Sequence, residues 1–289
     1  MIDFNYQRPR SLEDAFHCLE QSGEHRILAG GTDLLVQIKN GLAAPESLVS
    51  LADLPELRGV EITDDGALRI GAASAISDVI ASSALQSFQP ALSRALSLIG
   101  SMQIRNRATV GGNLCNASPA ADSAPLLLAL GAEVELLSSN GKRLLSLDKF
   151  FLGGGQTALA KGELMSGIFL PPKAAKMRAL HLKQGIRQRM DIAIASVAAA
   201  LLLDGGVCKE AGIAFGSLAP RPIRAVKAEQ LLLASDPPDL AAVAAQASLE
   251  AAPSTREFVR ASVSYRRDVA KALTLRILET LFSDDWEVK

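Results

Sequence analysis

Two glycine pairs, Gly30-Gly31 and Gly111-Gly112, constrain the fold of this 289-residue chain more than any other local feature. The first pair follows a short apolar segment, residues 25–29, which is predicted to be a strand. Glycine reaches positive φ without strain and lacks the side chain that would keep another backbone or a ligand at a distance. Consecutive N–H groups exposed in such loops can bind an anion. Each pair therefore predicts a tight turn or a close approach to the backbone.

If the fold brings the two loops face to face, they can hold the pyrophosphate of a dinucleotide. Backbone amides would then bind the phosphates without lysine side chains, and polar side chains beside the glycines would add hydrogen bonds: Thr32, Thr109 and Asn113. The alternative is that each glycine pair is only a turn. Neither loop matches G-x-G-x-x-G, so a Rossmann site is not expected.

Charged residues close to the loops have two interpretations each. A carboxylate at Asp33 would repel a phosphate, so Asp33 is predicted to cap the helix that follows it. Arg105 and Arg107 precede the second loop. They would either offset the phosphate charge or form surface salt bridges.

Composition excludes several function classes. The formal net charge is −1 and there is no basic stripe, so nucleic-acid binding is not predicted. The longest apolar stretch, residues 197–203, is too short to span a bilayer, and the N-terminal segment does not resemble a signal peptide. A cytoplasmic location is therefore expected. Three isolated cysteines and three histidines form no ligand pattern, so neither a metal site nor an iron-sulfur cluster is predicted in this chain.

Up to about residue 170, short strands, isolated helices and glycine-rich loops alternate. Ser11 is predicted to cap a helix over 11–22. Residues 108–116 are predicted to be a small-residue loop, and 138–141 a hairpin turn. The other expected strands are 25–29, 48–51, 68–72 and 133–137, and the other expected helices are 34–39, 75–83, 90–99 and 119–130.

The composition changes after Pro171–Lys176, which is the predicted linker. Three strands of one sheet are expected beyond it, with a hairpin turn at 204–206 between the last two. Alanine-rich amphipathic segments then predict a helical cluster. The chain length fits two domains or one large domain, and this change favours two. The expected strands are 179–183, 194–203 and 208–215, and the expected helices are 225–234, 239–251 and 265–282.

Longer motifs around the glycine loops resemble a known family, the FAD-binding medium subunits of molybdenum hydroxylases such as xanthine dehydrogenase and carbon monoxide dehydrogenase. The segment 27–34 followed by Lys39 resembles the first flavin motif, and the run 103–136 resembles the second. The similarity extends over nearly the whole chain, because further segments also fit: Phe4–Pro9, and Lys183 with Arg189–Ala193.

This resemblance implies a fold and a division of labour. Residues 1–173 would form the two-lobed α+β FAD-binding domain of the vanillyl-alcohol oxidase (PCMH) type. Residues 176–289 would form the CO dehydrogenase flavoprotein-like C-terminal domain, a small sheet with a helical bundle. In the family, molybdopterin is held by a large subunit and iron-sulfur clusters by a small subunit. The medium subunit passes electrons through non-covalent FAD to NAD or another acceptor, so no catalytic residue is assigned here.

The resemblance also assigns the cofactor contacts. Residues 27–34 would wrap the pyrophosphate and residues 109–113 would close on it. Asp122 would accept a hydrogen bond from a ribosyl or ribityl hydroxyl, and Lys183 would lie near the isoalloxazine ring. The residues expected to contact the cofactor are Ile27, Leu28, Ala29, Gly30, Gly31, Thr32, Asp33, Leu34, Gly100, Thr109, Gly111, Gly112, Asn113, Cys115, Asp122, Leu164, Met165 and Lys183. Within that set, Cys115 would lie against the cofactor as a small apolar residue, and Leu164 and Met165 would cover the adenine side.

Two departures from the family limit what the resemblance implies. Ile192 follows Asp191 where the carbon monoxide dehydrogenase branch has tyrosine, which puts aromatic shielding of the flavin in doubt. The chain also lacks the cysteine-rich insertion of the 4-hydroxybenzoyl-CoA reductase branch. Two alternatives stay open: a stand-alone FAD-dependent oxidoreductase on the same fold, and a module that has lost its flavin. The substrate is not predicted, because the pocket that selects it would belong to another chain.

Overall fold

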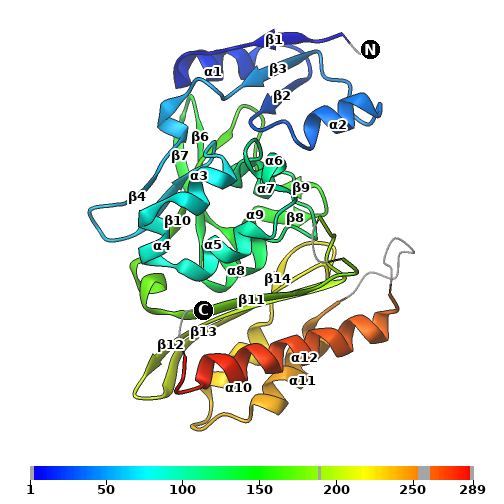
Figure 1. The fold of residues 1–289 in the computed structure, drawn as a ribbon. Helices are drawn as coiled ribbons and strands as arrows, with labels where there is room; N and C mark the ends of the chain where they lie inside the picture. The colour runs from blue at the N-terminus through cyan, green and yellow to red at the C-terminus, as the bar shows by residue number, and fades with distance from the viewer. Residues whose placement is uncertain (1–2, 188–189, 253–260, 287–289) are drawn as a thin grey trace.

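The computed structural model describes residues 3–187, 190–252 and 261–286, so Arg189 of the last motif lies outside the described residues. Three parts follow one another along the molecule (Figure 1): a small N-terminal lobe, a central lobe, and a C-terminal sheet covered by helices. The chain mixes helices and sheets throughout, in the α+β arrangement that the sequence predicted.

The N-terminal lobe is a parallel sheet in the order β1-β3-β2 with two helices. Ser11 caps the first helix as predicted, because its Oγ accepts a hydrogen bond from Asp14 N at 3.1 Å. This helix buries Ala15, Phe16 and Leu19 against the sheet. The elements are β1 (Asn5–Gln7), α1 (Leu12–Glu20), β2 (His25–Leu28), α2 (Leu34–Lys39) and β3 (Ser47–Ser50).

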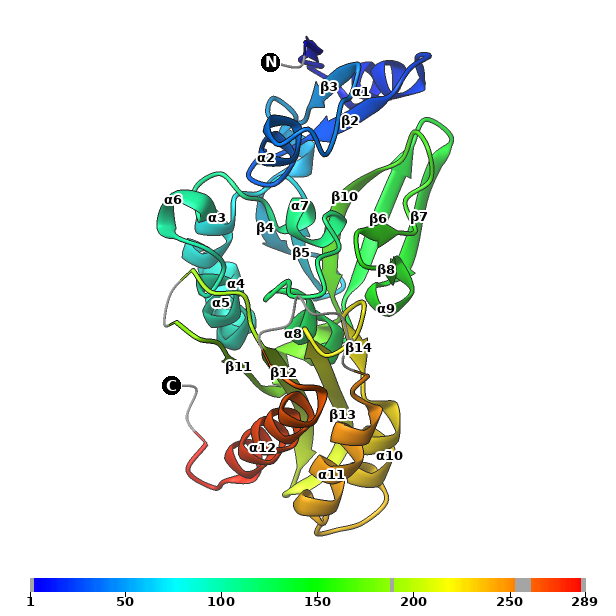
Figure 2. The same ribbon diagram turned by 90° about the vertical axis from the view of Figure 1, so that its right-hand side faces the viewer.

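The central lobe is an antiparallel sheet in the order β4-β5-β10-β6-β7, with short helices against it (Figure 2). Its middle strand, β10, was not predicted, because the periodicity of a short, mostly apolar run does not distinguish a buried strand from a helix. The strands are β4 (Val60–Ile62), β5 (Leu68–Gly71), β6 (Glu133–Ser138), β7 (Gly141–Ser146), β8 (Phe151–Gly153), β9 (Gln156–Thr157) and β10 (Leu164–Leu170). The helices are η1 (Pro55–Leu57), α3 (Ile76–Ala81), α4 (Ser83–Phe88), α5 (Pro90–Ser97), α6 (Met102–Arg105), α7 (Val110–Cys115), α8 (Ala124–Ala129) and α9 (Leu147–Phe150).

Two predictions in the central lobe were wrong. The small-residue loop predicted over 108–116 contains the short helix α7, which Thr109 caps by accepting a hydrogen bond from Gly112 N at 3.0 Å. The helix predicted over 119–130 begins only at Ala124, since residues 118–123 form turns. In both cases the glycine, serine and proline content sets the local preference, and tertiary packing decides where the helix begins.

The C-terminal sheet confirms the three predicted strands and adds β14. Its long hairpin turns at Gly205-Gly206, both at positive φ as a two-residue turn requires. The strands are β11 (Arg178–Gln184), β12 (Ala195–Asp204), β13 (Val207–Gly216) and β14 (Ile223–Arg224), and the helices are α10 (Val226–Leu233), α11 (Leu240–Glu250) and α12 (Val263–Phe282).

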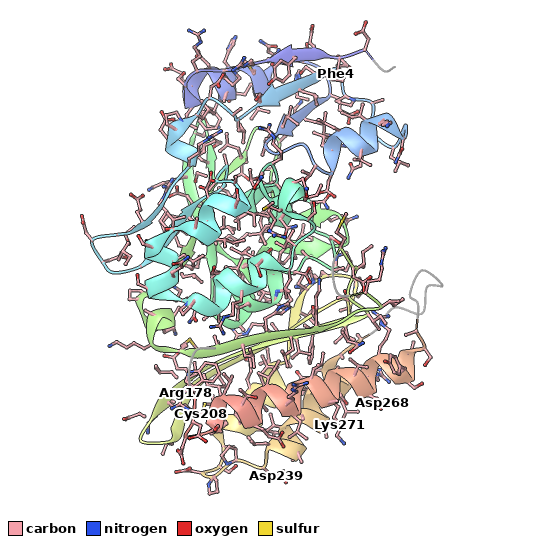
Figure 3. All side chains as sticks on the ribbon, viewed as in Figure 1. Phe4, Arg178, Cys208, Asp239, Asp268 and Lys271 are labelled. Atoms are coloured by element: carbon pink, nitrogen blue, oxygen red, sulfur yellow. The ribbon has the colours of Figure 1, made fainter. Side chains whose placement is uncertain are left out.

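Both faces of this sheet are buried. Along β12, Val197 and Leu201 pack against the C-terminal helices, whereas Ala198 and Ala200 face the central lobe. On α12, Asp268 and Lys271 lie on the exposed side, away from the sheet (Figure 3). Within the described ranges, no helix is both long and apolar enough to cross a membrane.

The segment predicted as a linker is packed rather than free. It forms the short helix η2 (Pro172–Lys176), in which Ala174 is fully buried. Gln89 on the loop before α5 donates from Nε2 to the carbonyl oxygens of Ala174 at 2.8 Å and Met177 at 3.2 Å. One hydrophobic core therefore continues from the central lobe into the C-terminal sheet.

Helix α8 forms the contact between these two parts, because it lies directly on β12 and β13. The contact is backbone to backbone at Gly212, where a Cβ atom would overlap the carbonyl oxygen of Ala129. Alanines on the same face of the sheet leave the room that α8 needs: Ala198, Ala200 and Ala214.

We expect Gly212→Ala to destabilise the protein, because the added methyl group must push α8 away from the sheet. Overpacking of this kind costs about 1–3 kcal/mol. Urea unfolding of the variant and the parent measures the difference. Lys209→Ala, at an exposed position of the same strand, is the matched control and should stay close to the parent. A Gly212→Ala protein as stable as that control would contradict the close contact.

Candidate functional site

A cavity of about 540 Å³ lies between the N-terminal lobe and the central lobe. Most of the predicted site residues line it together, from the β2–α2 connection, α7 and the start of β10. They are Ile27, Leu28, Ala29, Gly30, Gly31, Thr32, Asp33, Leu34, Thr109, Gly111, Gly112, Asn113, Cys115, Leu164 and Met165. The predicted meeting of the two glycine loops is therefore present in the structure.

Backbone contacts hold the two loops together. A Cβ atom on Gly30 would overlap the carbonyl oxygen of Arg107, and one on Gly111 would lie 2.6 Å from the carbonyl oxygen of Ala72. Gly111 N donates to that same Ala72 oxygen at 3.0 Å. These two glycines are therefore required for close packing of main chain, and the cavity depends on the contacts that they permit.

The other two glycines face the cavity. Gly31 has φ +74°, and it is the only one of the four at positive φ, so the prediction that these loops need positive φ holds at one position. A Cβ atom on Gly112 would meet Thr109 Oγ1 at 2.7 Å and otherwise only Ala29, at 3.9 Å. A side chain at Gly112 would consequently extend toward the gap between the loops.

The turn after Gly30 presents free amides. Among the residues that the structure describes, the N–H groups of Gly31, Thr32 and Asp33 have no hydrogen-bond acceptor. The predicted cap was wrong, because the exposed Asp33 carboxylate makes no capping bond to α2. Three successive unpaired amides in a cavity wall form a cradle for an anion.

Neither arginine before the second loop lines the cavity. Arg105 donates from Nη1 to Ile99 O at 2.9 Å and to Gly100 O at 3.4 Å, so it braces the turn before α6. Arg107 is exposed. The cationic residues that do line the cavity are Arg26 and Lys161, and no local motif singles them out.

The thiol of Cys115 is a cavity-wall group without reactive character. Burial raises the pKa of the Cys115 thiol to about 12, so it is neutral at physiological pH. It fits the predicted role of a small apolar residue.

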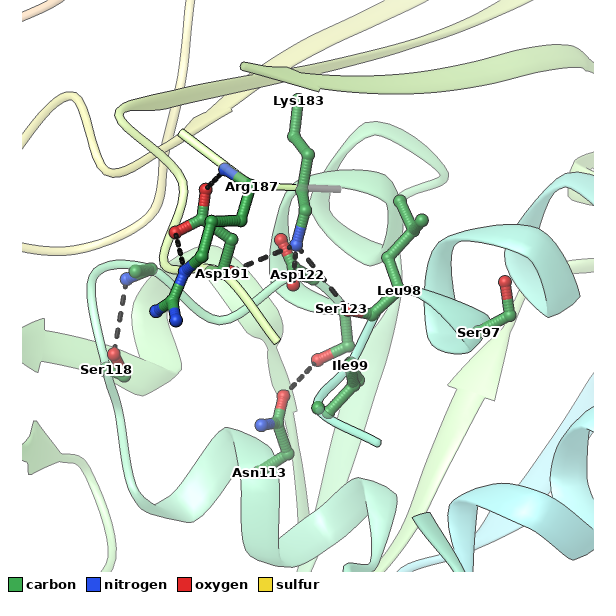
Figure 4. Close-up of polar contacts among 12 residues, drawn as sticks. Ser97, Leu98, Ile99, Asn113, Ser118, Asp122, Ser123, Lys183, Arg187 and Asp191 are labelled. Atoms are coloured by element: carbon green, nitrogen blue, oxygen red, sulfur yellow. Dashed lines mark hydrogen bonds and ion pairs between the residues drawn. The ribbon is translucent and has the colours of Figure 1, made fainter. Parts of the chain in front are cut away.

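Three predicted residues, Gly100, Asp122 and Lys183, lie outside the cavity lining. Lys183 Nζ donates to Asp122 Oδ2 at 2.8 Å and to Asp191 O at 3.3 Å (Figure 4). A longer contact, 3.5 Å, reaches Leu98 O. Gly100, at φ +52°, forms the turn two residues beyond Leu98. Lys183 thus connects strand β11 to the turns before α8 and after α5.

A hydrogen bond links this charged pair to the cavity. Ser123 Oγ, next to Asp122 in the chain, donates to Asn113 Oδ1 in the cavity wall at 2.6 Å. Within the described residues, Asp122 Oδ1 is buried without a hydrogen-bond partner. Desolvation raises the pKa of the Asp122 carboxyl although Lys183 opposes the shift. A buried carboxylate oxygen of this kind is suited to accept a hydrogen bond from a hydroxyl group.

His181 lies two residues before Lys183 on β11 and points to the same side of the sheet. It is buried, and neither ring nitrogen has a hydrogen-bond partner within the described residues. Burial, assisted by the nearby Lys183 charge, lowers the pKa of His181 to about 4. The folded protein therefore holds this imidazole neutral.

Comparison with known proteins agrees with this geometry. Residues 2–173 match the model of the family described as the FAD binding domain in molybdopterin dehydrogenase. Residues 181–281 match the CO dehydrogenase flavoprotein C-terminal domain. The chain belongs to this family of FAD-binding subunits.

Individual relatives are similar over almost their full length. The xanthine dehydrogenase FAD-binding subunit of Escherichia coli O157:H7 is 36% identical over 284 residues, 96% of each chain. The carbon monoxide dehydrogenase medium chain of Afipia carboxidovorans is 35% identical over 283 residues, again 96% of each chain. In the solved carbon monoxide dehydrogenase from Hydrogenophaga pseudoflava, one chain superposes with a TM-score of 0.90 at 32% identity, covering 96% of this chain and 97% of that one.

We expect stability to fall as the pH drops from the ordinary His pKa of 6.5 toward about 4, because the unfolded chain takes up a proton that folded His181 does not. Linkage gives a loss of about 2 kcal/mol between pH 7.5 and pH 5. His181→Leu should remove that part of the pH dependence of the unfolding free energy.

Urea unfolding at the two pH values, with His17→Leu at an exposed position as the control, checks this expectation. If the parent and His181→Leu lost the same free energy of unfolding over this range, folded His181 would not be held neutral.

Proposed function

We propose that this chain binds one FAD non-covalently in the cavity between its lobes and relays electrons within a molybdopterin-dependent hydroxylase. The observation that carries the proposal is the pair of glycine loops, packed main chain against main chain, with three unpaired amides facing the cavity. The negative charge of a dinucleotide pyrophosphate matches this cradle of amides.

Different residues of the site would contact different parts of FAD. The amides of Gly31, Thr32 and Asp33 would hold the pyrophosphate, and Gly112 would leave it room. Leu164 and Met165 would form the apolar wall on the adenine side. The unpartnered oxygen of Asp122 would accept a hydrogen bond from a hydroxyl of the cofactor.

Lys183 takes a different role from the one implied by the resemblance. Its ammonium already contacts Asp122 and Asp191 O, so it would hold the Asp122 carboxylate in place rather than act as a free cation beside the flavin. A buried ion pair of this kind fixes geometry at the cost of desolvation.

FAD, when bound, supplies the ability to accept electrons from a one-electron donor and pass them on as a pair. We propose an iron-sulfur small subunit as the donor, a molybdopterin-binding large subunit as the site of substrate oxidation, and NAD or another acceptor as the final oxidant. Residues 1–173 would carry the cofactor and residues 176–289 would complete its surroundings through Lys183. The predicted cytoplasmic location stays a prediction.

We expect Gly112→Val to lose most of its FAD affinity, since the added side chain extends toward the gap between the two loops. Flavin content per chain after purification, and titration of the flavin-free chain with FAD, measure the effect. Acid precipitation should release all the flavin of the parent into the supernatant, as non-covalent binding requires.

Gly153→Val is the matched control, because the three atoms nearest to an added Cβ there all belong to the side chain of Gln156, outside the cavity. Equal flavin content in Gly112→Val and Gly153→Val proteins of similar melting temperature would place the cofactor elsewhere.

We also expect the isolated chain to oxidise no purine, aldehyde or N-heterocycle, because the relay needs its partner subunits. Mixed with the matching large and small subunits, it should co-elute with them, and substrate should then bleach the visible flavin absorbance. Turnover by the isolated chain would favour a stand-alone oxidoreductase. A co-eluting complex in which substrate reduces the iron-sulfur centres and never the flavin would rule out the relay.

A further inference from the structure

One arginine on the far edge of the central sheet holds the loop that precedes β10. Arg143 lies on β7, the edge strand, and β6 separates it from β10. Its Nε and Nη2 atoms donate to Glu163 Oε1 and Oε2, each at 2.8 Å. Nη2 also donates to Ala158 O at 2.7 Å, while Glu163 Oε2 accepts from Ala160 N at 2.7 Å. A single ion pair therefore joins both ends of the loop 158–163.

This loop is a wall of the cavity. Residues 159–163 all line it, next to Leu164 and Met165. Ala158 and Leu159 pack against the hydrophobic core, but the rest of the loop has no such anchor, because Ala160 and Lys161 are exposed and Gly162 turns at φ +80°. In this second half the polar contacts are those of Glu163, whose side chain is only 12% exposed.

The cavity differs in chemistry at its two ends. The end at 158–163 is walled by the apolar side chains of Leu159, Leu164 and Met165, and it also carries the charged residues Lys161 and Glu163. The other end leads past Asn113 and Ser123 to the charged pair of Asp122 and Lys183. A flat purine base suits the apolar end, and a polyhydroxyl chain suits the charged end.

We propose that Arg143 and Glu163 are positioning residues that fix the 158–163 loop against the adenosine end of the cofactor and so set a preference for FAD over FMN. This inference rests on the proposed function. FMN has no adenosine half, so it would reach the glycine loops without touching this wall.

The ion pair of Arg143 and Glu163, here called the clamp, orders the loop locally and contributes little to the stability of the whole protein. An ion pair with a half-exposed arginine adds little to the folding free energy. A bidentate arginine–carboxylate pair nevertheless fixes the geometry of both partners. The clamp already orders the loop in the free protein. Binding therefore does not carry the entropic cost of ordering it.

The test uses the full chain and the variant Arg143→Met. We expect FAD affinity to fall about tenfold while FMN affinity stays within about twofold of the parent, because only FAD uses the ordered wall. Amide hydrogen exchange at 159–163 should become faster, and the melting temperature should change little. Lys142→Met is the matched control, since Lys142 neighbours Arg143 on β7 but pairs with Glu135, outside the cavity.

Two further variants keep the test decisive if Arg143→Met folds poorly. Arg143→Lys retains the charge without the two-pronged geometry, and Glu163→Gln retains the side-chain shape without the charge. Both should lower FAD affinity more than FMN affinity. Unchanged FAD affinity in all variants, or equal losses for FAD and FMN, would overturn the clamp. A parent chain that binds FMN but not FAD would overturn the proposed function together with it.

Discussion

The contact between two stretches of main chain, Gly30 against the Arg107 carbonyl and Gly111 against the Ala72 carbonyl, is the constraint on which the site depends. A side chain at Gly30 would push the two lobes apart, and one at Gly111 would push α7 away from the end of β5. The lobes also share a hydrophobic cluster, in which Phe16 and Leu19 of the N-terminal lobe pack with Ala73 and Leu164 of the central lobe. A cavity with amide-lined walls exists at this junction because main chain packs directly on main chain at Gly30.

A second junction joins the cofactor-binding lobes to the C-terminal sheet, and it combines two kinds of packing. Alanines and Gly212 let α8 lie directly on the sheet, which fixes the turn that carries Asp122. Lys183, from the sheet, then meets that carboxylate in a buried ion pair. Such a pair is sensitive to geometry, because a buried charge without its partner is costly. The small residues in the contact and the ion pair therefore depend on each other.

Local sequence rules explain the elements that begin or end at a helix cap or a glycine turn. The cap at Ser11 and the hairpin turn at Gly205-Gly206 form as predicted, because a cap or a two-residue turn depends only on its own residues and their neighbours. Asp33 and the 108–116 segment did not. At Asp33 a free carboxylate remains where a cap was predicted, and at 110–115 contacts with Ala72 and a cap from Thr109 stabilise a helix that glycine-rich sequence disfavours.

The family, the α+β architecture and half of the cavity lining could be predicted from the sequence, because the glycine motifs are contiguous and specific. The pairing of Asp122 with Lys183, outside the cavity lining, follows from long-range packing and could not be predicted locally. The tertiary structure also decided that Arg26 and Lys161, rather than Arg105 and Arg107, are the cationic residues of the wall. The reason is physical: motifs encode the local backbone, whereas charge pairing depends on which strands and turns the long-range packing of α8 and β10 brings together.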